Sequence, residues 1–338
     1  MKAIGLYKYL PIKDKNSLQD VEIAEPEVNG HDLLVQVQAI SVNPVDTKIR
    51  APKEKIETEP RVLGWDGSGI VVAIGADVMH YAIGDQVYYA GDITRSGSNS
   101  EFQLVDERIV GKKPTTLSFD QAAALPLASI TAWEALFDRL GISAEGDDAG
   151  KLILIIGAAG GVGSIATQLA SKVAKLNVIA TASREKSREW CLKHGANSVI
   201  NHGKPLNEEL ADIDIATVDY ILCLNNTDQH WLGMTEAIKP QGKICSIVET
   251  SNVDHGRLKS KSVSFVWEFM FTRSMYQTSD IIEQQRLLNR VAELIDEGEL
   301  VTTASKLIQP INAENLRKAH SMIEQGDSIG KIVLSDWV

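Results

Sequence analysis

Residues 152–170, LILIIGAAGGVGSIATQLA, constrain the fold of this chain more than any other stretch of its sequence. The five apolar residues at 152–156 are too few for a helix and are typical of a strand that is buried on both faces. The chain then turns through four glycines, and from Ser164 onward its apolar residues have helical spacing. A strand, a glycine turn and a helix in direct succession form a phosphate site, because the first N–H groups of the helix point at the anion.

The glycines also match a dinucleotide-binding pattern. Ala158-x-Gly160-x-x-Gly163 is the dinucleotide fingerprint with alanine in the first glycine position. Flexible turns in other α/β proteins can carry similar glycines, but here a strand and a helix stand in register on either side. We therefore expect Gly160, Gly161 and Gly163, together with Val162, to hold the pyrophosphate of a dinucleotide.

The pattern of apolar residues changes near residue 125. Before it, short stretches such as LLVQVQAISV, IGDQVYYAG and EFQLVDERIV alternate apolar and polar residues and are separated by turn residues. Such period-two alternation predicts a partly open β-barrel or a sandwich. From Lys151 onward, short apolar strands (NVIATA, SVIN, DYILCL, KICSIV) alternate with helices, one of which ends at Gly195. This alternation predicts a parallel, doubly wound sheet.

The overall composition excludes several classes of partner. The chain is 44% hydrophobic, which is ordinary for a globular protein, and its formal net charge is −11. Nucleic acids and anionic membranes need a basic face, so neither is expected as a partner. We find no secretory signal and no apolar run near the length of a membrane span, and we expect a cytoplasmic location. Cys191, Cys223 and Cys245 are widely spaced and are predicted to be free, buried thiols.

Six strings, in order along the whole chain, resemble the medium-chain dehydrogenase/reductase superfamily. They are NPVDTKIR (43–50), LGWDGSGIV (63–71), GDQV (84–87), LPLASITAWEAL (125–136), GAAGGVGS (157–164) and GKIVL (330–334). Within the superfamily the chain resembles the quinone oxidoreductase-like reductases, and residues 261–278 resemble the branch called zinc-type alcohol dehydrogenase-like.

This resemblance implies a fold, a domain organisation and an assembly. The implied fold is α/β, with a GroES-like partly open β-barrel domain and a Rossmann doubly wound parallel sheet. The GroES-like catalytic domain would comprise residues 1–127 and 272–338, and the Rossmann dinucleotide-binding domain residues 128–271. Relatives extend their sheets across a two-fold axis through the strand near Val263–Val266, so a homodimer is also implied.

The same resemblance raises the question of a catalytic zinc. Such a site needs three protein ligands from cysteine, histidine or carboxylate side chains. The zinc enzymes carry a cysteine in the first string and His-Glu in the second, where this chain has Asn43 and Trp65-Asp66, and their third ligand matches 125–127, LPL. Asp46 and Asp66 are left without cysteine or histidine partners. We therefore predict no metal site.

The residues that follow the second strand of the nucleotide fold distinguish NADH from NADPH. An NAD enzyme places Asp or Glu there, about twenty residues after the glycines, to hold the ribose hydroxyls. This chain has Ser183 and Arg184, which suit a 2′-phosphate, and Lys186 follows. The resemblance places His202 where relatives have an aromatic residue near the same phosphate. We expect NADPH as the cofactor, with a solvated helix charge as the alternative interpretation of Arg184.

Three further residues are expected near the nicotinamide half of the cofactor. Asn225 and Val248 end the fourth and fifth strands, at the carboxyl edge of the sheet. Thr131 matches a threonine that faces the nicotinamide amide in relatives, and its alternative is a helix hydroxyl bonded to its own backbone. A set of apolar residues either walls the acceptor pocket or belongs to the core or a dimer contact: Trp65, Trp267, Phe269, Met270 and Phe271.

The candidate catalytic residues all lie in the first string. The resemblance places Asn43 at the nicotinamide end of the site, where its amide could donate a hydrogen bond to the carboxamide of the nicotinamide or to the oxygen of the acceptor. The alternative is an asparagine that orders the turn before a proline. Asp46 either relays a proton or forms an ion pair with Lys48 or Arg50. Related reductases often have a tyrosine in place of Lys48, which as a lysine could still assist as an acid.

These residues together predict a reaction. Without zinc, the oxygen of a simple alcohol is not polarised by a metal. Hydride transfer to an electron-poor acceptor does not need that help, and each hydrogen bond to the developing enolate oxygen is worth about 10²–10³ in rate. We expect a zinc-independent NADPH-dependent oxidoreductase acting on a quinone or an α,β-unsaturated carbonyl. The alternatives are an alcohol dehydrogenase with a non-standard metal site and a nucleotide-dependent sensor with little turnover.

Overall fold

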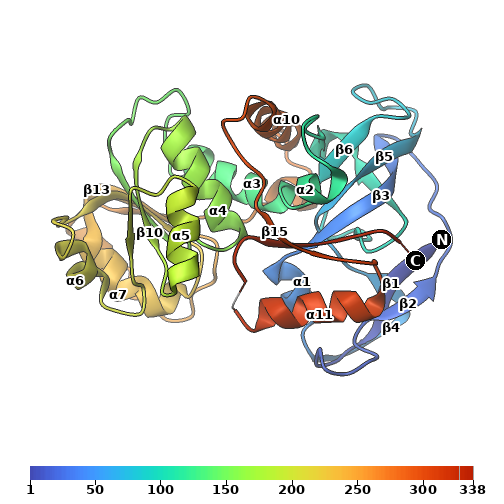
Figure 1. The fold of residues 1–338 in the computed structure, drawn as a ribbon, viewed down its shortest axis with the longest axis horizontal. Coiled ribbons are helices and arrows are strands. Elements are labelled where there is room, and N and C mark those ends of the chain that lie inside the picture. The colour runs from blue at the N-terminus through green and yellow to red at the C-terminus, as the bar shows by residue number, and fades with distance from the viewer. Residues whose placement is uncertain (327, 338) are drawn as a thin grey trace. The chain divides into compact units, whose positions relative to one another are not determined.

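The computed structural model describes residues 1–326 and 328–337. The chain divides into two compact units, of which Met1–Leu127 and Phe271–Val338 form the first and Ala128–Met270 form the second. Figure 1 shows that both ends of the chain belong to the first unit, so the second unit is an insertion in the sequence of the first.

The larger sheet of the first unit is mainly antiparallel. Its strands are β3 (Asp32–Val42), β5 (Gly67–Ile74), β6 (Gln86–Tyr89), β7 (Phe102–Asp106), β8 (Val110–Lys112), β15 (Ala304–Ile308) and β16 (Lys331–Ser335). They follow the order β15-β16-β3-β5-β6-β8. β7 lies outside this order and pairs with residues 32–36 of β3. Alternate residues of β3, such as Leu33 and Val35, pack with Val71 and Val87 in a buried apolar core, as period-two alternation predicts.

A smaller sheet and several helices complete the first unit. The sheet has the order β2-β1-β4, built from β1 (Lys2–Tyr9), β2 (Gln19–Glu22) and β4 (Lys53–Val62). The helices are α1 (Pro44–Arg50), α2 (Phe119–Ala123), α9 (Thr272–Tyr276), α10 (Glu283–Asp296) and α11 (Ala313–Glu324). Figure 1 shows α11 in red alongside α1, and an ion pair between Arg50 and Glu324 joins these two helices.

The second unit contains a parallel sheet. Its strands are β9 (Leu152–Ile156), β10 (Asn177–Thr181), β11 (Ser198–Ile200), β12 (Val218–Cys223), β13 (Ile238–Ser246) and β14 (Ser264–Trp267). Their order is β11-β10-β9-β12-β13-β14, and every neighbouring pair is parallel. The order runs outward in both directions from β9, as in a doubly wound sheet. Together with the mainly antiparallel first unit, this sheet confirms the predicted fold class.

Helices connect the parallel strands of the second unit. They are α3 (Pro126–Trp133), which starts at the end of the first unit, α4 (Gly161–Gln168), α5 (Glu185–Lys193), α6 (Leu206–Ala211), α7 (Thr227–Ala237) and α8 (Gly256–Lys259). The predicted strand at 152–156 is confirmed residue for residue, but α4 begins at Gly161 and not at Ser164. Gly161 and Gly163 are therefore already helical, and Gly160 is the N-cap residue. Gly195 follows α5 with a φ of 104°, which confirms the predicted glycine end of this helix.

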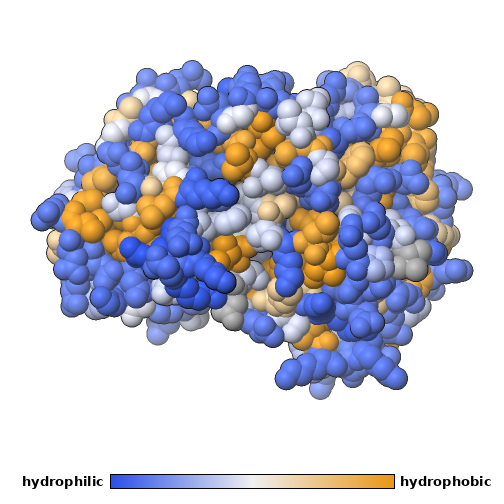
Figure 2. Space-filling view, in the orientation of Figure 1, coloured by the Kyte–Doolittle hydropathy of each residue, from blue (hydrophilic) through white to orange (hydrophobic). Residues whose placement is uncertain are grey.

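The surface and the cysteines of the chain are consistent with its composition. Figure 2 shows a face on which hydrophilic side chains predominate and apolar ones form smaller groups between them. Cys191, Cys223 and Cys245 are free and buried, as predicted. No helix within residues 1–326 and 328–337 is long and apolar enough to cross a membrane.

Candidate active site

The first candidate site of the protein forms where β3 ends and α1 begins. Asn43 precedes α1 in an extended conformation, and Pro44 occupies the first helical position, where its missing N–H breaks no helical bond. The backbone N–H of Asn43 donates to Oδ2 of Asp46, three residues along the helix. This bond turns the Asp46 side chain back toward the start of α1 and into the interior.

Asp46 is a buried carboxyl group with one satisfied oxygen. Its side chain is 1% exposed, and Oδ1 has no hydrogen-bond partner among the described residues. Burial raises the pKa of Asp46 to about 7, against the opposing effects of the Asn43 N–H and the Lys331 ammonium. Asp46 can therefore hold a proton near neutral pH.

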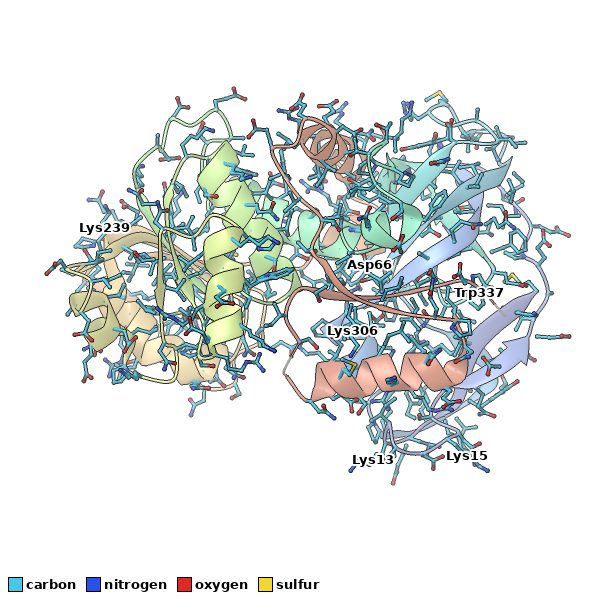
Figure 3. All side chains as sticks on the ribbon, viewed as in Figure 1. Lys13, Lys15, Asp66, Lys239, Lys306 and Trp337 are labelled. Carbon is cyan, nitrogen blue, oxygen red and sulfur yellow. The ribbon has the colours of Figure 1, made fainter. Side chains whose placement is uncertain are left out.

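Asp66 precedes β5 and connects three segments of the first unit. Its Oδ2 accepts hydrogen bonds from Asn43 Nδ2 and Lys331 Nζ, both at 2.8 Å, and its Oδ1 accepts the N–H of Leu127 at 2.8 Å. Burial raises the pKa of Asp66, while the Lys331 ammonium and these hydrogen bonds oppose the rise. Figure 3 places Asp66 within the drawn outline of the first unit, whereas Lys13 and Lys15 project from its edge.

Lys331 completes this group through the register of two strands. β16 is antiparallel to β3 with Ile332 opposite Val42, which places Lys331 next to Asn43. The ammonium donates to Asp66 Oδ2, to Asn43 Oδ1 and, at 3.2 Å, to the carbonyl of Val42. We call Asn43, Asp46, Asp66 and Lys331 the polar cluster.

The polar cluster changes the interpretation of Asn43 and its neighbours. The amide of Asn43 is 2% exposed and is bonded on both sides, so it does not face solvent as a free donor. Asp46 forms no ion pair with Lys48 or Arg50 in the part of the chain that the structure describes, because Arg50 pairs with Glu324 and Lys48 is exposed on α1. The ion-pair alternative for Asp46 is therefore wrong.

The aromatic residues fall into two groups. Trp65 and Phe271 are buried in the first unit and pack edge to face, with ring centroids 6.1 Å apart, so they belong to its core. Met270 is also buried, at the end of the second unit. Trp267 and Phe269, at the edge strand β14, are 47% and 48% exposed.

The second candidate site lies in the second unit, at the glycine turn between β9 and α4. Gly157 has a φ of 83°, which favours glycine, and Gly160 caps the helix that starts at Gly161. A Cβ on Gly163 would lie 2.5 Å from Ala158 Cα, so this glycine allows the helix to pack against the turn. Gly160, Gly161 and Val162 are half-buried, whereas Gly163 is buried. The N–H groups of residues 161–163 start the helix, where none has an intrahelical acceptor. The turn therefore fits a pyrophosphate.

The end of β10 carries the residues expected at the 2′-phosphate. Ser183, Arg184 and Lys186 are all exposed, and Arg184 caps α5. Thr181, the last residue of β10, accepts the N–H of Gly157 and lies 3.1 Å from Nδ1 of His202. Burial and the nearby Arg184 lower the pKa of His202. These contacts hold His202 beside the glycine turn.

The remaining predicted residues occupy the carboxyl edge of the same sheet or lie on α3. Asn225 follows β12, and its Cβ would be 3.5 Å from a Cβ on Gly157. Val248 follows β13, and its carbonyl accepts the hydroxyl of Thr227 at 2.7 Å. Thr131 is buried on α3 in the same unit. Sequence reasoning thus singled out residues near the carboxyl edge of this sheet but missed Lys331, for which the only signal was its place in the string GKIVL.

Comparison with known proteins identifies the family. Residues 29–115 match the alcohol dehydrogenase GroES-like domain, and residues 194–334 match the zinc-binding dehydrogenase family. A zinc-type alcohol dehydrogenase-like protein of Staphylococcus epidermidis is 44% identical over 338 residues, which cover 99% of each chain. The chain belongs to the medium-chain dehydrogenase/reductase superfamily.

Solved structures and a plant enzyme extend the comparison of this medium-chain dehydrogenase/reductase. A Rhizobium etli protein provisionally described as a zinc-dependent alcohol dehydrogenase is 49% identical, with a TM-score of 0.95 and coverage of 100% of this chain and 98% of that chain. The Escherichia coli quinone oxidoreductase complexed with NADPH is 25% identical, with a TM-score of 0.84 and coverage of 99% and 100%. The 2-methylene-furan-3-one reductase of Solanum lycopersicum is 38% identical over 200 residues, covering 56% of this chain and 50% of that enzyme. These similarities make the protein an oxidoreductase with a nicotinamide-dependent dehydrogenase fold.

The names of several relatives imply zinc, and the polar cluster tests that implication. A catalytic zinc takes cysteine, histidine or carboxylate ligands. Around Asp66 the structure instead places an ammonium, a carboxamide and a backbone N–H, all of which are already bonded to it. Within the described ranges no three His, Cys, Asp or Glu side chains gather as a metal site would require. The donor set of this medium-chain dehydrogenase/reductase does not fit zinc.

Proposed function

We propose that this protein is a zinc-independent, NADPH-dependent reductase of a small quinone, enone or enal. The observation that carries the proposal is the Lys331 ammonium, 2.8 Å from Asp66 at a position where the zinc enzymes use metal ligands. Because Asp66 is bonded to this ammonium, it is not free to bind a metal ion that would act as a Lewis acid in alcohol oxidation. The similarity to a quinone oxidoreductase and to a furanone reductase supports an electron-poor acceptor.

The proposed cofactor site uses the carboxyl edge of the parallel sheet. Gly160, Gly161, Val162 and Gly163 would hold the pyrophosphate through the start of α4. The 2′-phosphate would bind the exposed side chains after β10 and His202, and Asn225, Val248 and Thr131 would lie toward the nicotinamide. In this proposal residues 128–271 form the dinucleotide-binding domain, and residues 1–127 and 272–338 form the catalytic domain.

The proposed reaction needs one hydride and one proton. The nicotinamide, when bound in its reduced form, supplies the hydride to a carbon from which the acceptor's carbonyl withdraws charge. The protein must then protonate the enolate or the quinol oxygen. Asp46 can hold that proton because its pKa is raised to about 7, and the exposed Lys48 on the same helix can donate a hydrogen bond. Asn43 holds Asp46 in the first turn of α1, and Lys48 lies in the last turn of the same helix.

The experiment that tests this function follows the oxidation of NADPH and of NADH with a panel of quinones, enones and enals, with and without a chelator. We expect turnover with NADPH that the chelator leaves unchanged, and less than stoichiometric zinc in the purified protein. Turnover confined to simple alcohols or aldehydes, or lost with the chelator, would mean that a metal site operates. Nucleotide binding without turnover would favour a sensor.

The proposed assembly is a homodimer formed through the edge of the parallel sheet. β14 is the last strand of that sheet, and Trp267 and Phe269 beside it are each about half exposed. An unpaired strand edge with exposed aromatic side chains is a template for pairing with a second chain. Sedimentation of the wild type and of a Trp267→Glu variant tests this assembly, since a dimer should become a monomer in the variant. A wild-type monomer would contradict it.

A further inference from the structure

The hydrogen bonds of Lys331 are complete and lie wholly inside the protein. The side chain is 4% exposed, and its ammonium has three N–H groups and three acceptors: Asp66 Oδ2, Asn43 Oδ1 and the carbonyl of Val42. A lysine is rarely buried to this degree unless it is paired. Val42 and Asn43 lie at the junction of β3 and α1, and Asp66 precedes β5. Lys331 joins them although it is 288 positions from Asn43 in the sequence.

This arrangement fixes the orientation of the Asn43 amide. An ammonium can only donate hydrogen bonds, so the side-chain oxygen of Asn43 must face Lys331. The side-chain NH2 group then faces the carboxylate of Asp66, at 2.8 Å. The reverse orientation would bring two sets of donors together at Lys331 and two acceptors together at Asp66. One charged pair therefore selects one of the two amide orientations.

The orientation of Asn43 is transmitted to α1. Asn43 is the cap residue of this helix, and its backbone N–H holds the carboxylate of Asp46. The first turn of α1 carries Asp46 and leads to Lys48, the two groups that the proposed function assigns to the proton. A helix of seven residues is too short to fix its own position by its internal bonds alone. The polar cluster therefore holds the first turn of α1 with Asp46, whereas the Arg50–Glu324 ion pair holds the last turn.

We infer that Lys331 is a positioning residue of the reductase, which acts through Asn43 to place the first turn of α1. The inference rests on the proposed function for its kinetic consequences but not for its structural ones. Neutralising the charged pair while keeping its shape should loosen the start of α1 without unfolding the sheet. Turnover then falls, whereas the KM for NADPH stays nearly unchanged, because the residues proposed for the pyrophosphate and the 2′-phosphate all lie in the second unit.

The kinetic test uses Lys331→Met alone, Lys331→Met with Asp66→Asn, and each of these with Asn43→Ala. Lys331→Met alone leaves a buried carboxylate unpaired and should lower the melting temperature, and the neutral double variant should restore it. We expect the double variant to keep a kcat lowered about 100-fold, as misplacement of about 1 Å can produce. Adding Asn43→Ala should then lower kcat by less than about 3-fold further, because the two changes remove one interaction.

The control is Lys306→Met on the neighbouring strand β15, where the lysine is exposed. It should change neither kcat nor the melting temperature. If the neutral double variant recovered both kcat and stability, Lys331 would serve only to balance the charge of Asp66, and the inference would be overturned. Multiplicative losses with Asn43→Ala would overturn it as well, since Lys331 would then act by another route. If the neutral double variant does not fold, Lys331→Met alone is combined with Asn43→Ala, and multiplicative losses in kcat would again overturn the inference.

Hydrogen exchange of the backbone N–H groups of residues 43–50 gives a readout that is independent of turnover. In the neutral double variant this segment should exchange about 10-fold faster than in the wild type at equal melting temperature, with residues 152–156 unchanged. Equal exchange in both proteins would overturn the inference even if the enzyme reduces quinones. Faster exchange in a protein that reduces no acceptor would support Lys331 and refute the proposed function.

Discussion

Gly163 and Ala158 stand closer together than any side chain on Gly163 would allow. A Cβ on Gly163 would lie 2.5 Å from the Cα of Ala158 and 2.5 Å from the carbonyl oxygen of Gly157. The two neighbouring atoms belong to the backbone, and a Cβ has no rotamer of its own, so no side-chain rotation relieves the overlap. The same construction at Gly160 finds its nearest atom, the oxygen of Gly157, at 3.5 Å. One fingerprint glycine is thus sterically required, whereas its neighbour has room for a methyl group.

Alanine should therefore be destabilising at Gly163 and tolerated at Gly160. Gly163→Ala must move α4 away from the glycine turn, and we expect NADPH affinity to fall by at least about 10-fold with a loss of about 1–3 kcal/mol in stability. Gly160→Ala, with a φ of −74° that alanine readily adopts, should keep stability within about 1 kcal/mol of the wild type. Cofactor fluorescence titration and urea unfolding of both variants measure these effects. Equal losses in the two variants would contradict the packing argument.

Replacing Arg184 tests the choice between NADPH and NADH. If the guanidinium binds the 2′-phosphate, Arg184→Met removes charge-assisted hydrogen bonds worth about 1.5–3 kcal/mol, or about 10- to 100-fold in the Kd for NADPH. The Kd for NADH should stay within about 2-fold, because NADH has no phosphate there. Lys193→Met, an exposed lysine at the other end of α5, serves as the control. A parallel loss for both cofactors would leave Arg184 as an ordinary helix charge.

The buried carboxyl group of Asp46 should make stability depend on pH. Burial raises its pKa from 3.8 to about 7, so the folded protein binds more protons than the unfolded chain between these values. This group therefore stabilises the fold fully below about pH 4 and loses that contribution as the pH rises through 7, by at most roughly 1.4 kcal/mol per pH unit. Asp46→Asn resembles the protonated form and should melt near the wild type at pH 4 but above it at pH 8. A constant difference between the two proteins across that range would show that Asp46 does not titrate there.

His320 should have the opposite dependence. It lies buried on α11, and within residues 1–326 and 328–337 neither ring nitrogen has a hydrogen-bond partner. Burial, with a smaller effect of Arg50, lowers its pKa from 6.5 to about 3. The unfolded chain binds the additional proton, so stability is present above pH 6.5 and is lost as the pH falls toward 3.

We expect His320→Leu to flatten this acid limb, with a urea midpoint near the wild type at pH 7 and above it at pH 5. His80→Leu, at an exposed histidine of the same unit, is the control and should leave the limb in place. An acid limb that is equally steep in wild type and His320→Leu would assign it to other groups.

The parallel sheet of the second unit could be predicted because its signals are local. The strand at 152–156, the glycine turn and the helix after it are consecutive in sequence, and each restricts the next. The glycine that ends α5 at Gly195 is equally local, since its φ of 104° follows from the turn itself. The helix start was misplaced at Ser164 because backbone N–H geometry, and not apolar spacing, determines where the first turn begins.

The polar cluster could not be predicted in the same way. Asn43 and Asp46 were singled out from one string, but the sequence does not show which charge faces them. Lys331 reaches Asn43 only because β16 pairs with β3 in one particular register, with Ile332 opposite Val42. A shift of one residue would turn Lys331 to the other face of the sheet. Neither NPVDTKIR nor GKIVL by itself determines how β16 and β3 pair.

Strands β15 and β16 follow the second unit in sequence, and this order has a consequence for how the protein is made. A ribosome that has released residues 1–300 has produced the whole of the second unit, Ala128–Met270, but neither β15 nor β16. The second unit is therefore free to fold during synthesis, whereas Asn43 and Asp66 must wait for β16 to emerge. Until Lys331 is synthesised, the nascent chain holds a carboxylate without its cation. Translation thus completes the parallel sheet before it completes the polar cluster.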